Sequence, residues 1–306
     1  MRRLALLFSL LLGLALVAGP AQAAAKPLPV QYDFIPGALF GGIPGSNAPG
    51  TNDWSCKPTA AHPNPVVLVH GTLGNRSTNW QTYGPLLKNN GYCVFALTYG
   101  STLPLPYPGA FGGLGDIPTS AAELGAFVDQ VLAATGADKV DIVGHSQGTL
   151  MPDYWIKFLG GAGKVGSYIS LSPLWHGTEL TGSSSMSTAA FAPGLDPLDL
   201  VGPALGQMSA GSAFITKLTS DGGVQVPGIN YVNIMTKYDE LVKPYTSGFE
   251  PGMTNIVLQD YCKQDYTEHF EMAADKNASI FVLNALDPAH PRPLVCSLVL
   301  PFVGGL

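Results

Sequence analysis

Short, uninterrupted apolar runs recur along this chain and alternate with segments whose apolar residues follow the helical period. Such runs are typical of strands that are buried on both faces of a parallel sheet. Six strands are predicted in this way, at Val66–Val69, Tyr92–Leu97, Val140–Val143, Val165–Leu171, Ile229–Met235 and Asn255–Leu258.

Helices are predicted between these strands. One of them carries a capping box formed by Ser120 and Glu123 and ends at Gly136. The other helical patterns cover Thr78–Asn89, Thr149–Leu159 and Phe270–Leu286. Strands that alternate with helices throughout predict an α/β fold, with a mostly parallel central sheet and helices on both faces.

Length and composition favour a single domain. The chain has 306 residues, of which 46% are hydrophobic, and this is enough for a sizeable core. We expect residues 24–306 to form one domain with two loop excursions rich in Gly and Pro, at about 99–118 and 181–212.

The N-terminal residues have the pattern of a secretory signal peptide. Arg2 and Arg3 precede an apolar stretch, and small residues follow it. We expect residues 1–23 to be this signal, with cleavage after Ala23 or Ala25. A membrane anchor is the alternative, but the apolar stretch is shorter than the roughly 20 residues that span a bilayer. The mature protein is therefore expected to be extracellular, with no integral membrane segment.

The charge balance argues against a nucleic-acid partner. The formal net charge is −6, and the sequence contains no basic run.

The four cysteines fit an oxidising compartment. They show no C-x-x-C spacing, so zinc and redox motifs are disfavoured, and two disulfides are expected instead. Three pairings are formally open. We favour Cys56–Cys93 and Cys262–Cys296, because each closes a local loop.

The motif G-x-S-x-G occurs at Gly144–Gly148, with Ser146 at its centre. The motif follows a predicted strand and precedes a predicted helix, which is the context of a nucleophile elbow. This sharp turn forces the serine into a strained backbone conformation and leaves no room for side chains two residues away on either side. The alternative is an ordinary glycine-rich turn. We expect Ser146 to be a nucleophile.

A serine nucleophile needs a base, and a histidine is the usual one. The sequence has six histidines. His269 lies between the last predicted strand and the last helix, where the chain order Ser, Asp or Glu, then His places the base. The alternative is a surface histidine at a helix start.

The acid that orients the base should also follow a strand. Asp239 follows the strand Ile229–Met235, and we therefore expect it to be the third triad member. The neighbouring Glu240 could serve instead, and Asp260 and Asp265 lie nearer to His269 in the sequence.

Backbone amides must stabilise the oxyanion in acyl transfer. The residue after the nucleophile, Gln147, supplies one, and a loop after an earlier strand supplies another. His70-Gly71-Thr72 directly follows Val66–Val69, so Thr72 is the expected second donor.

Several stretches of the chain resemble secreted lipases of the α/β-hydrolase fold. The bacterial class 2 lipases are the closer model, because the chain has the first elbow glycine and the His-Gly pair that Candida-type lipase B lacks. The similar stretches are Pro65–Gly74, Val140–Gly148, Ser172–Thr178, Tyr238–Tyr245 and Tyr261–Met272. The resemblance implies the same triad, the same oxyanion donors and the same two disulfides.

Together, these features predict a secreted serine carboxylester hydrolase, and specifically a triacylglycerol lipase that forms an acyl-enzyme on Ser146. A short-chain carboxylesterase or a polyester hydrolase is the alternative; an acyltransferase or a catalytically silent binding protein is more distant. We expect no cofactor and no metal, a monomeric protein, and an ester substrate met at a lipid–water interface. The two loop excursions could line an acyl cleft, form a lid, or be plain surface loops.

Overall fold

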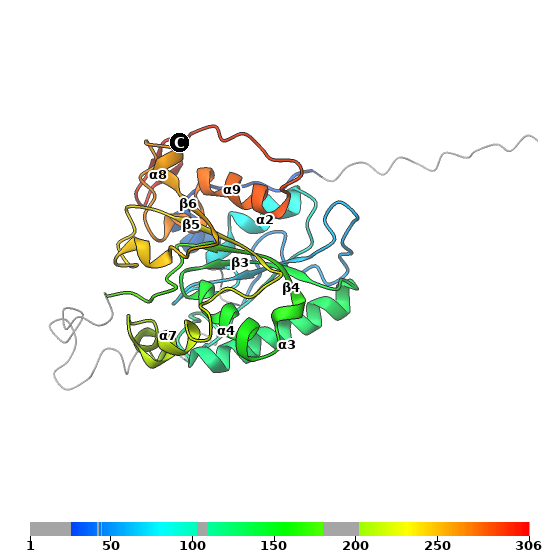
Figure 1. Ribbon diagram of the computed structural model, residues 1–306. Helices are drawn as coiled ribbons and strands as arrows, with labels where there is room; N and C mark the ends of the chain where they lie inside the picture. Colours follow the sequence, from blue (N-terminus) through cyan, green and yellow to red (C-terminus); the bar gives the residue numbers. More distant parts are fainter. Residues whose placement is uncertain (1–25, 42, 44, 103–108, 180–201, 306) are drawn as a thin grey trace, which may run out of the picture.

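A parallel β-sheet forms the centre of the protein. The computed structural model describes residues 26–41, 43, 45–102, 109–179 and 202–305. Six strands run parallel in the order β2-β1-β3-β4-β5-β6 (Figure 1). The strands are β1 Val66–Val69, β2 Val94–Leu97, β3 Val140–His145, β4 Val165–Leu171, β5 Asn230–Met235 and β6 Thr254–Val257. All six predicted strands are confirmed, each to within two residues at either end.

The strands are buried on both faces because helices cover both sides of the sheet. In β1, the side chains of Val66 and Leu68 join one hydrophobic cluster, whereas those of Val67 and Val69 join the other. This is the period of two that a strand imposes on its side chains. Helices α2 (Tyr83–Asn89) and α9 (Lys276–Leu286) cover one face, and α3 (Ile117–Thr135) and α4 (Met151–Phe158) cover the other (Figure 1).

The start predicted for the helix α3 is wrong. Its N-cap is Asp116, whose carboxylate accepts a hydrogen bond from the Thr119 amide at 2.9 Å. Pro118 lies in the first turn, where its missing N–H costs nothing. The residues of the expected capping box lie inside the helix, and Glu123 accepts from the Gly100 amide instead. The predicted end is confirmed, since Gly136 has φ 78°.

The segment predicted as one helix from Phe270 to Leu286 is interrupted. A 3-10 turn at Glu271–Ala273 is followed by a new start at Lys276, because the Asp275 carboxylate caps the Ala278 amide. Similarly, the helical pattern at 78–89 divides into the 3-10 turn Thr78–Trp80 and the helix α2. The pattern at 149–159 forms the helix α4, which the 3-10 turn Ser146–Thr149 precedes.

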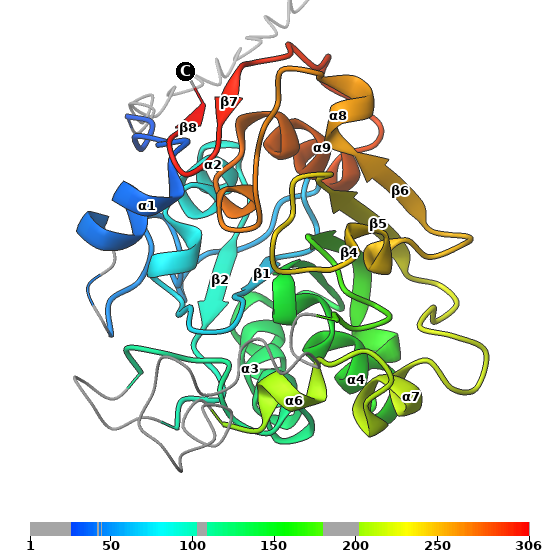
Figure 2. The same cartoon turned by 90° about the vertical axis from the view of Figure 1, so that its left-hand side faces the viewer.

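Smaller elements complete the described part of the chain. Helices α6 and α7 lie beside α3 and α4, whereas the hairpin β7-β8 lies on the other side with α1 and α2 (Figure 2). The remaining elements are α1 Phe34–Pro36, the π-helical turn Gly37–Gly41, the 3-10 turns Ala162–Lys164 and Tyr245–Gly248, α6 Ala204–Gln207, α7 Ala213–Leu218, α8 Leu258–Tyr261, β7 Val299–Leu300 and β8 Gly304–Gly305.

Both expected disulfides are present. Cys56–Cys93 ties the N-terminal lead-in to the residue before β2, and Cys262–Cys296 ties the end of α8 to the C-terminal segment. Within the described ranges, no helix combines the length and the apolar character needed to cross a membrane.

Some expectations concern residues outside the described ranges. These are the signal peptide with its cleavage site and most of the second excursion, residues 181–201, together with residues 103–108 of the first.

Candidate active site

Ser146 occupies a sharp turn between β3 and the 3-10 turn that follows it. Its φ is 55°, a left-handed conformation that costs a non-glycine residue energy. The residues on either side, His145 and Gln147, are buried, whereas Ser146 is partly exposed. The turn therefore holds a serine within reach of solvent at the carboxyl edge of the sheet.

The glycines of the motif are required by contacts across this turn. A Cβ atom on Gly144 would lie 2.0 Å from the carbonyl oxygen of Gly148. A Cβ atom on Gly148 would lie 2.1 Å from the carbonyl oxygen of Val69, at the end of β1. Gly71 is packed against Ser146 itself, because a Cβ atom on Gly71 would lie 3.0 Å from that of Ser146. The elbow and the His-Gly turn thus form one closely packed unit.

The side chains of Thr72 and Gln147, the two residues expected to supply oxyanion donors, are in contact. The side-chain Nε2 of Gln147 donates to Thr72 Oγ1 at 3.0 Å and to the Gly113 carbonyl at 2.9 Å. Met208 packs against both residues, with its sulfur 3.9 Å from Thr72 Oγ1 and 3.8 Å from Gln147 Nε2. The Gln147 side chain therefore links the elbow to the loops after β1 and β2, a contact that the sequence did not predict.

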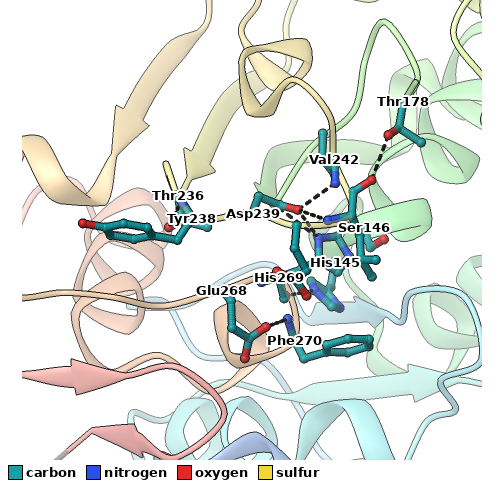
Figure 3. Close-up of polar contacts among 12 residues, drawn as sticks. His145, Ser146, Thr178, Thr236, Tyr238, Asp239, Val242, Glu268, His269 and Phe270 are labelled. Atoms are coloured by element: carbon teal, nitrogen blue, oxygen red, sulfur yellow. Dashed lines mark hydrogen bonds and ion pairs between the residues drawn. The ribbon is translucent and has the colours of Figure 1, made fainter. Parts of the chain in front are cut away.

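Asp239 and His269 form a buried pair. Both carboxylate oxygens of Asp239 lie 2.9 Å from His269 Nδ1, and the two side chains are 2% and 3% exposed. Asp239 Oδ1 also accepts from the amides of Leu241 and Val242, at 3.0 and 2.7 Å. The loop after β5 thereby fixes the carboxylate that faces the imidazole (Figure 3).

The charges around this pair favour an ionised imidazole. Burial works to lower the pKa of His269, but the carboxylate of Asp239, with help from Glu240 and Glu268, outweighs it, and the pKa lies above its ordinary value. Burial likewise works to raise the pKa of Asp239, yet the imidazole and the loop amides hold it below its ordinary value. The pair is therefore built to stabilise a proton on His269.

The other acids considered from the sequence have different partners. Glu240 accepts from the backbone amide of His269 at 3.0 Å rather than from its ring. Asp260 forms an exposed ion pair with Lys237. Asp265 accepts from the Thr267 amide and from the Asn277 side chain. Asp239 alone among these carboxylates contacts the imidazole within the described ranges.

The histidines next to the two motifs are buried and contact neighbouring residues of the core and the loops. His70 is fully buried, stacks on Tyr99 with ring centroids 4.3 Å apart, and receives the Tyr99 amide at Nε2. Burial lowers its pKa to about 4. His145 is also buried, and its Nε2 lies 2.9 Å from the backbone carbonyl of His269. Figure 3 shows His145 and Ser146 in one group with His269 and Asp239.

The described residues contain no group of three or more His, Cys, Asp or Glu side chains that could hold a metal ion.

The fold is that of the α/β-hydrolases, and comparison with known structures supports this assignment. Lipase B of Aspergillus fumigatus superposes with a TM-score of 0.58 at 21% sequence identity, covering 83% of this chain and 64% of that one.

The model of the class 2 lipase family matches residues 63–281, and the chain belongs to this family. A triacylglycerol lipase of Pseudarthrobacter phenanthrenivorans is 36% identical over 95 residues, which are 29% of this chain and 27% of the relative. Lipase B of Pseudozyma antarctica is 27% identical over 189 residues, which are 60% of this chain and 48% of the relative. The matched regions thus span about a quarter to a half of these relatives.

Proposed function

We propose that the protein is an exported serine carboxylester hydrolase, a triacylglycerol lipase that forms an acyl-enzyme on Ser146. The observation that carries this proposal is the buried Asp239–His269 pair in one group with a strained, partly exposed serine. Membership of the class 2 lipase family gives independent support.

The proposed reaction is acyl transfer in two steps. His269 Nε2 takes the proton of Ser146 Oγ as this oxygen attacks the ester carbonyl carbon, and Asp239 stabilises the resulting imidazolium. The backbone amides of Thr72 and Gln147 bind the oxyanion, each worth about 3 kcal/mol in the transition state. The imidazolium then protonates the leaving alcohol. In the second step, His269 deprotonates a water molecule that attacks the acyl carbonyl carbon. The acyl–Oγ bond then breaks, the imidazolium returns the proton to Ser146 Oγ, and the acid is released.

Lipid esters are the proposed substrates. Two relatives are named triacylglycerol lipases. The apolar side chain of Met208 lies against the two proposed oxyanion residues, which suits an acyl chain better than a charged group. A short-chain carboxylesterase or a polyester hydrolase would use the same chemistry.

Export is proposed on the N-terminal pattern of residues 1–23 together with the two disulfides, which form in oxidising compartments. Residues 24–306 are proposed to act as one catalytic domain and as a monomer.

Two substrates test the proposal: a soluble 4-nitrophenyl butyrate and an emulsified long-chain triacylglycerol. We expect the parent protein to hydrolyse both, and Ser146→Ala to lose at least 1,000-fold of the rate on both, because the loss of a triad member costs about 10⁴- to 10⁶-fold. Unchanged turnover in Ser146→Ala contradicts the serine mechanism. Hydrolysis of the butyrate alone contradicts the lipase assignment and favours the esterase.

A further inference from the structure

The backbone of His269 is held on both sides by side chains from other parts of the chain. Its amide donates to Glu240 Oε2 at 3.0 Å, and its carbonyl oxygen lies 2.9 Å from His145 Nε2. Glu240 is 29 residues away in the sequence, in the loop after β5, and His145 is 124 residues away, at the end of β3. Hydrogen bonds from both backbone groups to side chains of distant residues restrict the position of this loop residue.

His145 is suited to act as a hydrogen-bond donor whose protonation state does not change. Its side chain is 3% exposed, and burial, followed by the proximity of His269, lowers its pKa to about 3. The ring is therefore neutral, and its proton lies on Nε2 because the partner there is a carbonyl oxygen. The other nitrogen, Nδ1, makes a longer contact of 3.3 Å with Asn79 Oδ1, and this oxygen also accepts from the Gly71 amide at 3.4 Å.

Glu240 contributes a hydrogen bond and a charge. Its Oε2 accepts from the His269 amide, and among the described residues its buried Oε1 has no hydrogen-bond partner. The titratable groups that face His269 are Asp239 and Glu240 from the loop after β5, Glu268 from its own loop, and His145 from β3. The three carboxylates favour the imidazolium, whereas His145 is neutral.

We propose that His145 and Glu240 are positioning residues, which hold the backbone of His269 so that its imidazole stays directed at Ser146. This inference rests on the function proposed above. Neither residue takes part in the chemistry. Their effect arises because a displacement of about 1 Å at a reacting group can cost about 100-fold in rate.

Glu240 is tested with a pair of variants measured on a soluble ester. We expect Glu240→Ala to lower kcat about 10- to 100-fold with little change in KM, because the side chain holds the base and does not bind substrate. Glu240→Gln keeps an oxygen that accepts from the amide, so most of kcat should return. Because the amide lacks the charge, the acidic limb of the kcat/KM profile of Glu240→Gln should move to lower pH. Asp129→Asn is the matched control, since it removes one negative charge from the exposed face of α3 and should move neither quantity.

His145 is tested with a second pair. His145→Phe keeps a planar ring but removes the donor, and we expect a similar 10- to 100-fold loss of kcat. His145→Gln places an amide donor near the position of Nε2 and should recover at least half of that loss on a logarithmic scale. Thermal unfolding of each variant shows whether it is folded. If His145→Phe does not fold, the kcat values of His145→Gln and of the two Glu240 variants test the inference.

The inference is overturned if folded Glu240→Ala and His145→Phe retain the kcat and the pH profile of the parent. It is also overturned if the variants lose only thermal stability, or if the conservative variants are no more active than the disruptive ones. An inactive parent, or an active Ser146→Ala, overturns the proposed function and this inference with it. If the parent is active and the variants of Glu240 and His145 keep its kcat and pH profile, the inference is overturned but the proposed function is not.

Discussion

Both carboxylate oxygens of Asp239 lie 2.9 Å from His269 Nδ1, although the two residues are 30 positions apart in the sequence. One residue follows β5 and the other follows β6 and α8, so the parallel sheet brings them to the same edge. Amides of the 239–242 loop fix the carboxylate. The side chains of Glu240, in the same loop, and of His145, at the end of β3, hold the backbone of the histidine.

This pair gives a first prediction. Asp239→Asn should lower kcat about 10⁴-fold, because an amide at this position neither stabilises the imidazolium nor selects the required tautomer. Steady-state hydrolysis of a soluble ester measures the effect. Asp260→Asn is the control, since Asp260 forms an exposed ion pair with Lys237 and should be dispensable. Equal losses in the two variants would contradict the assignment of Asp239.

A second prediction concerns the pH dependence of kcat/KM. The base acts only when His269 is neutral, so activity should rise as the pH rises through its pKa. Despite burial, the nearby carboxylates raise that pKa above its ordinary value of about 6.5. Half-maximal kcat/KM in the acidic limb should therefore lie above about pH 6.5. A limb centred near pH 5 would show that these carboxylates do not act on the base.

Much of this arrangement follows from the sequence. The strands were predicted closely because helices cover both faces of the sheet, which leaves uninterrupted apolar runs such as Val66–Val69. The elbow serine is predicted by its motif between a strand and a helix, Asp239 by its position after a strand, and His269 by the order of serine, acid and histidine along the chain. Parallel strands bring residues that follow them to one edge of the sheet, and this does not depend on the conformation of the loops between the strands.

The parts that could not be predicted depend on loop conformation or on competition between local signals. Ser120 and Glu123 match a capping box, but the helix begins earlier because Asp116 caps it and Pro118 fits its first turn. The contacts of Glu240 and His145 with the backbone of His269 involve main-chain atoms, which are the same for every residue type. No sequence pattern marks them.

A third prediction tests the packing of the elbow. Gly144→Ala should abolish activity and lower thermal stability, because the new Cβ would lie 2.0 Å from the carbonyl oxygen of Gly148. Gly163→Ala is the matched control, since a Cβ there meets nothing within 4 Å. Thermal unfolding and ester hydrolysis are measured for both variants. A Gly144→Ala protein as stable and active as the control would contradict the packing described here.

A fourth prediction concerns stability and a carboxyl away from the site. Asp153 in α4 is fully buried, accepts from the Tyr231 hydroxyl at 3.0 Å, and burial raises its pKa to about 8. The folded protein therefore keeps a proton that the unfolded chain loses above about pH 4. Stability should fall as the pH rises from about 4 to 8, by on the order of 1 kcal/mol per pH unit for this group.

Asp153→Asn removes this dependence, because its amide is neutral and its oxygen can still accept from Tyr231. Denaturant unfolding measures the free energy of unfolding at pH 5 and pH 8. We expect the variant to gain in this free energy relative to the parent as the pH rises. A constant difference between the two proteins at both pH values would contradict the raised pKa of Asp153.

The most direct test of the account is to trap the nucleophile. A long-chain alkyl phosphonate reacts with an activated serine and leaves a stable adduct, which can be located by mass spectrometry after trypsin digestion. The peptide 140–157 contains one serine, Ser146. The account predicts one adduct per chain on this peptide at Ser146, formed at least 100-fold more slowly in His269→Ala. An adduct at another residue, or labelling at the same rate without the imidazole, would contradict it.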